Sequence, residues 1–154
     1  MLKIKPMKEI ERKFLVKDCS VIQACSFDVI KQSYLFNETN KSLRVRIKND
    51  NAFLTIKGNL VGISRDEYEY QIPIGEALEI IDKFNLKVLS KKRYYLNVDE
   101  LTWEIDVFEG ALSGLVVAEI ELPSEHYEFK LPTWVGEEVT FDKSYFNAEL
   151  IKKL

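Results

Sequence analysis

Residues 9–14 read EIERKF, and the alternation within this stretch decides how the chain folds. Successive side chains of a β-strand point to opposite faces, so residues two apart share a face. Glu9, Glu11 and Lys13 therefore lie on one face, and Ile10 lies on the other. The pattern predicts a strand with one apolar and one charged face.

The same alternation recurs in six further stretches of the chain. In each of them, charged or hydroxyl side chains two apart oppose apolar ones. These sets are Arg44, Arg46 and Lys48; Thr55 and Lys57; Glu67 and Glu69; Lys91 and Arg93; Glu104 and Asp106; Glu119 and Glu121. An antiparallel sheet with one solvated side also alternates in this way. However, solvated faces usually mix in Ser, Asn and Gln, whereas here the charges dominate and each stretch carries one sign.

Sorted charges of this kind predict a ligand. Like charges two apart on a strand repel each other unless an opposite charge or a ligand lies between strands. Carboxylate pairs suit hard cations such as Mg²⁺ or Mn²⁺, and arginine and lysine pairs suit phosphate. Together they indicate a site for a metal–polyphosphate complex. The alternation does not say which face is inside. A barrel of about eight strands would put the charged face around a wet interior, with helices covering the apolar outside.

The sequence predicts mostly strands in one domain, residues 1–154. Strands are expected at 7–16, 32–37, 42–49, 52–58, 66–73, 88–97, 102–109 and 115–123. Helices are expected at 18–30, 75–85 and 142–153, the last with Asp142 as its N-cap. Residues 49–51 favour a tight hairpin. Residues 124–137 are expected to form a covering loop or a short irregular helix.

The composition excludes several classes of protein. The net charge is −3 and charged residues make up 31% of the chain, which argues against a general nucleic-acid binder. His126 is the single histidine, so a histidine triad or a multi-histidine zinc site is excluded. The apolar runs are too short to span a bilayer, so no membrane association is expected. Cys19 and Cys25 do not form a disulfide framework, which favours a cytoplasmic location.

The ordered motifs resemble those of the CYTH superfamily, the triphosphate tunnel metalloenzymes. ExExK at 9–13 is followed in the family's order by RxR at 44–46, TxK at 55–57, ExE at 67–69, KxR at 91–93, ExD at 104–106 and ExE at 119–121. Residues 138–147 and 31–35 resemble the short bacterial members, although those members commonly have glycine where Ser33 stands. The resemblance covers nearly the whole chain. It implies a mainly β (α+β) fold, a closed eight-stranded antiparallel barrel with helices outside.

The resemblance also implies roles for individual residues. The residues expected to bind Mg²⁺ or Mn²⁺ are Glu9, Glu11 and Glu121, with Glu119 and Asp106 as further candidates. Phosphate binding falls to Lys13, Arg44, Arg46, Lys57, Arg93 and Lys143. Glu67 and Glu69 would hold a second metal or orient the attacking water, and Lys91 would donate a proton to the leaving phosphate or simply bind it. Arg12 has the opposite parity and is expected on the outer surface.

The leading prediction is an inorganic triphosphatase that cleaves tripolyphosphate to pyrophosphate and phosphate by attack of a metal-activated water. A nucleoside or thiamine triphosphatase would use the same residues. A class IV adenylate cyclase fits the C-terminal segment less well, and a non-catalytic polyphosphate-binding module has little use for so many carboxylates on one face. The expected partner is a small-molecule triphosphate, with no nucleic acid and no membrane. The oligomeric state is left open, with a homodimer among the options.

Overall fold

A computed structural model describes residues 8–154 of the chain, so the predicted strand start at residue 7 lies outside the described part. The strands are β1 (Lys8–Val16), β2 (Phe27–Glu38), β3 (Lys41–Lys48), β4 (Asn51–Lys57), β5 (Ser64–Ile72), β6 (Leu89–Val98), β7 (Leu101–Phe108), β8 (Val116–Glu121) and β9 (Val135–Glu138). The α-helices are α1 (Ile74–Lys83) and α2 (Asn147–Leu150). Short 3-10 turns are η1 (Cys19–Ala24), η2 (Gly110–Leu112), η3 (Lys143–Tyr145) and η4 (Ile151–Lys153).

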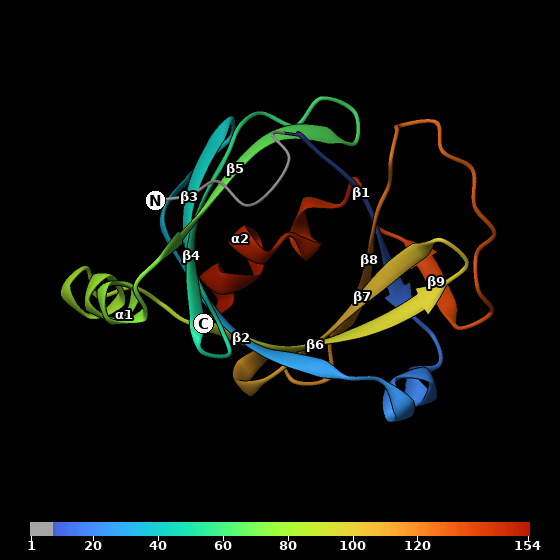
Figure 1. Ribbon diagram of the computed structural model, residues 1–154, viewed down its shortest axis with the longest axis horizontal. Coiled ribbons are helices and arrows are strands. Elements are labelled where there is room, and N and C mark those ends of the chain that lie inside the picture. The colour runs from blue at the N-terminus through green and yellow to red at the C-terminus, as the bar shows by residue number, and fades with distance from the viewer. Residues whose placement is uncertain (1–7) are drawn as a thin grey trace.

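The strands close into an antiparallel barrel (Figure 1). Their order is β5-β4-β3-β2-β6-β7-β8-β1, and β1 returns to β5, where Ile10 pairs with Ser64. The predicted eight-stranded barrel is therefore confirmed. The ninth strand, β9, adds to the other part of β1, with Val16 opposite Val135.

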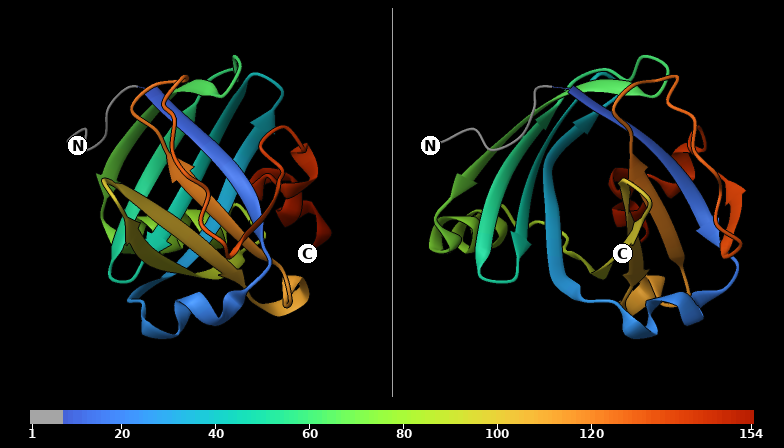
Figure 2. Two further views of the ribbon diagram at one scale, coloured as in Figure 1. Left: turned by 90° about the vertical axis from the view of Figure 1, so that its right-hand side faces the viewer. Right: turned by 45° about the vertical axis from the view of Figure 1, so that its right-hand side comes forward.

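The apolar face of the strands is the outside of the barrel, which decides the question that the alternation leaves open. On β1, β7 and β8 this outer face carries Phe14, Trp103 and Ile120, all fully buried. The segment 124–134 runs along this side of the barrel and covers it with Phe129 and Trp134 (Figure 2). Trp103 meets the Trp134 ring edge-on, with the ring centroids 5.2 Å apart. The charged face is thereby left to line the interior.

Helix α1 covers another part of the outer wall. It confirms the helix predicted at 75–85. Ala77 is fully buried against Val45 and Ala52 of the strands below. The predicted hairpin is confirmed as well, because Asn49 has a positive φ of 53° and the strands pair from Lys48 opposite Asn51. Among residues 8–154, no helix is both long and apolar enough to cross a membrane.

The helix predicted at 18–30 is wrong in length and type, because only a 3-10 helix of six residues, η1, forms within it. Asp18 caps η1 through a hydrogen bond from the Ser20 backbone N–H, and the chain is extended again at Cys25. Strand β2 already begins at Phe27, which pairs with Tyr94 of β6. The apolar residues of this stretch fit both the helical period of about 3.6 residues and the strand period of two. Pairing with a strand distant in sequence selects the extended form.

The C-terminal helix predicted at 142–153 is broken into η3, α2 and η4. Asp142 does cap the start, accepting from the Ser144 N–H at 3.0 Å, but Phe146 is extended and interrupts the helix. The segment lies at one end of the barrel interior and not on the outside (Figure 1). Leu150 and Ile151 pack there against inward-facing apolar side chains. The expectation that the helices cover the outside is therefore corrected for this segment, whereas α1 and η1 do pack on the outer face.

The segment predicted as a loop or short irregular helix at 124–137 is a loop that ends in β9. The start of β9 inside this range was not predicted. Gly136 permits its close approach to β1, because a Cβ there would lie 3.0 Å from the Leu15 carbonyl oxygen. Any larger residue would push β9 away from β1.

Arg12 lies on the outside, as its parity predicts. Its guanidinium donates two hydrogen bonds to Glu138 of β9, at 2.7 and 2.6 Å, and lies 5.3 Å from the ring centroids of both Phe14 and Phe129. We expect Arg12→Ala to lower the free energy of unfolding by about 1 kcal/mol, because the pair is partly solvated but the geometry is bidentate. Urea denaturation measures this effect. Turnover should stay at the wild-type value, and a large loss of turnover would contradict an outer structural role.

Candidate active site

Closure of the barrel gathers the charges by sign. Around the barrel, β7, β8, β1 and β5 are consecutive, and these are the strands that carry the acidic pairs. The basic side chains of the motifs lie mainly on β4, β3 and β6, which are consecutive apart from the mostly neutral β2. The interior thus has an acidic half, formed by the inner faces of β7, β8, β1 and β5, and a basic half, formed by the inner faces of β4, β3 and β6.

A cavity of about 950 Å³ opens into this interior. Acidic and basic side chains line it together, including Glu9, Glu11, Lys13, Arg44 and Lys57. A smaller chamber of about 40 Å³ shares Glu9, Glu11, Arg44 and Lys57 with this cavity. Its wall also includes Arg46, Arg93, Glu104, Glu119 and Glu121. Most of the residues that the sequence singled out therefore face one connected space.

The acidic half holds carboxylates next to one another. Glu11 on β1 stands directly opposite Glu121 on β8 in the strand register. Burial, reinforced by the charges of Glu119 and Glu9, raises the pKa of Glu11 to about 8. A carboxylate with these neighbours is stabilised by a bound cation, and an all-oxygen donor set fits Mg²⁺ or Mn²⁺. The donor chemistry therefore fits a metal ion, although within residues 8–154 no three acidic groups are already drawn together around one point.

Two lysines form ion pairs with several carboxylates of the interior. The Lys57 ammonium lies 2.7 Å from Glu9 and 3.2 Å from Glu67. Burial alone would lower the pKa of Lys57, but the two carboxylates outweigh it and raise the pKa. Lys13 lies 3.2 Å from Glu119, and the same balance raises the pKa of Lys13. Both lysines stay charged and remain available for an anion.

The basic half contains a buried arginine, Arg46, whose positive charge has little compensation from nearby carboxylates. Arg44 donates to Thr55 at 3.1 Å and lies 3.6 Å from Glu69. Burial, together with the charges of Arg44 and Arg93, lowers the pKa of Arg46, and its buried Nε has no hydrogen-bond partner among the described residues. A buried guanidinium in this state attracts an anion with several oxygens.

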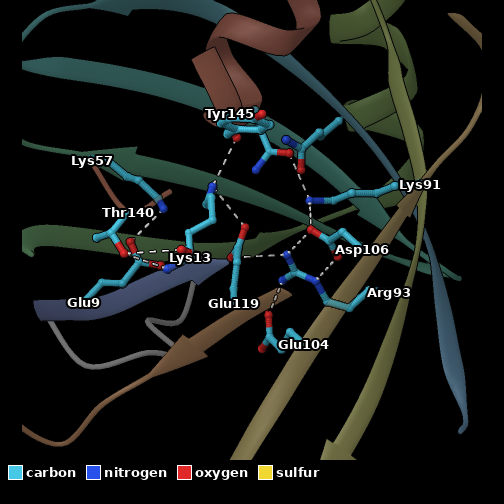
Figure 3. Close-up of polar contacts among 12 residues, drawn as sticks. Glu9, Lys13, Lys57, Lys91, Arg93, Glu104, Asp106, Glu119, Thr140 and Tyr145 are labelled. Atoms are coloured by element: carbon cyan, nitrogen blue, oxygen red, sulfur yellow. Dashed lines mark hydrogen bonds and ion pairs between the residues drawn. The ribbon is translucent and has the colours of Figure 1, made fainter. Parts of the chain in front are cut away.

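One buried ion cluster joins β6 to β7 (Figure 3). Arg93 donates to both oxygens of Asp106, at 2.7 and 2.8 Å, and also pairs with Glu104. Lys91 pairs with the same Asp106 carboxylate, which is fully buried. The Asp106 carboxylate is thus surrounded by its two cations.

The structure separates the predicted residues into those that line the cavities and those behind them. Four predicted residues, all at most 5% exposed, are missing from the described cavity walls: Glu67, Glu69, Lys91 and Asp106. Each of them contacts a side chain that does line a wall. Glu67 holds Lys57, Glu69 accepts from Thr55 beside Arg44, and Asp106 holds Arg93.

The C-terminal segment also borders the cavity. Lys143 is exposed at the outer part of its wall, while the Tyr145 carbonyl accepts from Lys13 at 3.4 Å. Asn147 accepts from Lys91 at 3.1 Å and lines both cavities. The sequence predicts no role for Asn147 and none for Glu104, although its parity puts Glu104 on the same strand face as Asp106. Nothing in the local pattern could have identified Asn147, because it lies outside the strands.

Comparisons with known proteins agree with this arrangement. A family model described as the CYTH domain matches residues 7–150. The chain is 48% identical to a protein named inorganic triphosphatase from Acetivibrio thermocellus, over 94% of both chains. It is 38% identical to an inorganic triphosphatase from Nitrosomonas europaea, over 94% of this chain and 97% of that one. A solved structure described as the inorganic triphosphatase NE1496 superposes with a TM-score of 0.67 at 34% identity, covering 93% of each chain. By its barrel, its ordered charged motifs and these matches, the chain belongs to the CYTH domain family.

Proposed function

We propose that the chain is a metal-dependent triphosphatase that hydrolyses inorganic tripolyphosphate to pyrophosphate and phosphate. The observation that carries the proposal is the division of the barrel interior into an acidic and a basic half that share one cavity. A triphosphate with divalent cations has the complementary distribution of charge. The relatives named inorganic triphosphatase, similar over nearly the whole chain, support the same substrate.

In this proposal the basic side chains bind the phosphate oxygens. Arg44, Arg46, Lys57, Arg93 and Lys13 line the cavities, and Lys143 stands at their outer edge. Phosphate oxygens compete with Glu9 for Lys57 and with Glu119 for Lys13. Substrate binding therefore releases carboxylates at the moment when a cation needs them.

The metal ligands in this proposal are the wall-lining acids Glu9, Glu11, Glu119 and Glu121. A divalent cation bound there, Mg²⁺ or Mn²⁺, would supply positive charge to the phosphate oxygens and make a water molecule more acidic. The chain's own contribution is to hold the substrate in line for attack and to keep the cationic side chains fixed. Phosphoryl transfer depends mostly on such positioning and charge stabilisation.

The buried residues behind the walls receive positioning roles. Glu67 and Glu69 hold Lys57 and Arg44, so we assign them to orient these cations and not the attacking water. Asp106 has both oxygens engaged by Arg93 and Lys91, so we assign it to the same purpose and not to a metal. Burial lowers the pKa of Lys91 to about 8. Lys91 donates a hydrogen bond to Asn147, which lines both cavities, so Lys91 is linked to the substrate through that residue.

A nucleoside triphosphatase is the second candidate. The larger cavity continues past the charged side chains to Asn37, Thr39, Asn59 and Leu60. These amide, hydroxyl and apolar groups offer contacts to an organic substituent on the triphosphate.

The reaction would take place in the cytoplasm, in keeping with the free thiols of Cys19 and Cys25.

Phosphate release from tripolyphosphate, ATP and thiamine triphosphate tests the proposal, each with Mg²⁺, Mn²⁺ or a chelator. We expect tripolyphosphate to have the highest kcat/KM and the chelator to abolish release. Faster release from ATP would favour the nucleoside triphosphatase, and cyclic AMP would indicate a cyclase. Binding of tripolyphosphate without release from any substrate would mean a binding module and would overturn the proposal.

A further inference from the structure

Asn147, the first residue of α2, stands between a buried cation and the cavity. It lines both the larger cavity and the smaller chamber. Among the described residues of the C-terminal segment 143–154, it is the one that reaches the smaller chamber. Its side-chain oxygen accepts a hydrogen bond from the Lys91 ammonium at 3.1 Å. The residue therefore touches the ion cluster on one side and the proposed substrate space on the other.

The contact with Lys91 fixes which end of the Asn147 amide faces the cavity. An ammonium group has only donors, so the amide must turn its oxygen toward Lys91. Lys91 is itself held in place by the fully buried Asp106, which Arg93 grips with two hydrogen bonds. A flip of the amide would place the Asn147 NH₂ group against the Lys91 ammonium, and the hydrogen bond between the two side chains would be lost. The Asn147 NH₂ group is thus the end left to face the cavity.

The surroundings hold the residue in this position. Leu150 and Ile151, within one turn of Asn147, are buried among apolar side chains at this end of the barrel. On the other side, the Tyr145 carbonyl accepts from Lys13, whose ammonium also lies 5.4 Å from the centre of the Phe146 ring. The short segment 145–147 is therefore fixed between two lysines of the interior.

We propose that Asn147 is a substrate-binding residue, whose side-chain NH₂ donates a hydrogen bond to a phosphate oxygen while its oxygen holds Lys91. The inference rests on the proposed function for the identity of the anion. It gives the C-terminal segment a direct part in recognising the substrate. It also explains how Lys91, buried behind the wall, is linked to the phosphate.

Two substitutions separate this role from a purely structural one. Asn147→Asp keeps an acceptor toward Lys91, but it places a negative acceptor where the phosphate needs a donor. Asn147→Ala removes both contacts. A residue that only anchors Lys91 would tolerate aspartate better than alanine. A residue that donates to phosphate would tolerate alanine better than aspartate.

Binding of tripolyphosphate is measured by titration calorimetry with a chelator present, which prevents metal-dependent turnover, and KM and kcat are measured with metal. We expect Asn147→Ala to bind about 10-fold more weakly and Asn147→Asp about 100-fold more weakly, in the range for hydrogen bonds to charged groups. KM should rise more than kcat falls. Asn97→Asp is the matched control, because the exposed Asn97 accepts from Thr102 and aspartate keeps that bond. We expect it to bind like the wild type.

Wild-type binding by Asn147→Asp, or weaker binding by alanine than by aspartate, would overturn the inference. Thermal unfolding of each variant shows whether a loss of binding comes from a loss of fold. The inference and the proposed function fail separately. If the wild type binds tripolyphosphate but releases no phosphate, the proposed function fails, while the order of the two variants in binding still decides the role of Asn147.

Discussion

Glu11→Gln is expected to lower metal-dependent turnover of tripolyphosphate by on the order of 10²–10³-fold, because the loss of a ligand to a catalytic cation removes several kcal/mol of transition-state stabilisation. Glu11 lines both cavities and faces Glu121 across the strand pair. Glutamine has almost the same shape but lacks the charge that a cation needs. The barrel should remain folded, because the substitution removes repulsion from neighbouring acids.

Turnover as a function of Mg²⁺ or Mn²⁺ concentration measures this effect, with thermal unfolding as the test of folding. Glu128→Gln is the matched control, since Glu128 is exposed on the covering loop and should turn over at the wild-type rate. Unchanged turnover and unchanged metal dependence in Glu11→Gln would remove Glu11 from the metal site. A variant that fails to fold would contradict the expectation that the barrel tolerates a neutral residue here.

Asp106→Ala is expected to lower the free energy of unfolding by about 3–5 kcal/mol, the range for removal of one partner from a buried ion pair. Asp106 is fully buried, and without it Lys91 and Arg93 would be left as two neighbouring cations of the interior. Asp106→Asn keeps the shape and part of the hydrogen bonding, so its loss of stability should be smaller.

Urea denaturation measures these losses, and Glu104→Gln serves as the comparison. Glu104 pairs with the same guanidinium, but its side chain is 34% exposed, so its removal should cost about 1 kcal/mol or less. The Asp106→Asn variant also tests the positioning role. If its metal requirement shifted as expected for Glu11→Gln while its stability stayed at the wild-type value, Asp106 would be a metal ligand after all.

Strand alternation predicted much of the fold because it is a local property. The parity of Arg12 against Glu11 and Lys13 correctly placed Arg12 outside, where it pairs with Glu138. The stretch 18–30 was misjudged because its apolar residues fit either period, and the partner strand that selects the extended form, β6, lies more than 60 residues away. The C-terminal helix was misplaced because its apolar residues pack inside the barrel, which local periodicity cannot distinguish from packing outside.

The candidate site divides in the same way. Parity alone placed Glu9, Glu11, Lys57 and Arg93 on one kind of face, and all four line the cavities. It could not distinguish them from Asp106 or Lys91, which share those faces but are buried behind them. Whether a side chain reaches the cavity depends on what its neighbours on adjacent strands leave uncovered. Asn147 lies outside any strand pattern, so only the tertiary structure identifies it.

The amino-acid sequence by itself determined that the strands have one charged face and that each strand carries mostly one sign. It did so because both properties depend on neighbours one and two residues apart in the chain. Only the tertiary structure decided that the acidic strands β1, β5, β7 and β8 lie side by side, through the return of β1 to β5. These strands are scattered along the sequence. Closure brings their carboxylates together opposite the arginines and lysines of β3, β4 and β6, because hydrogen-bonded pairing, and not sequence order, sets which strands are neighbours.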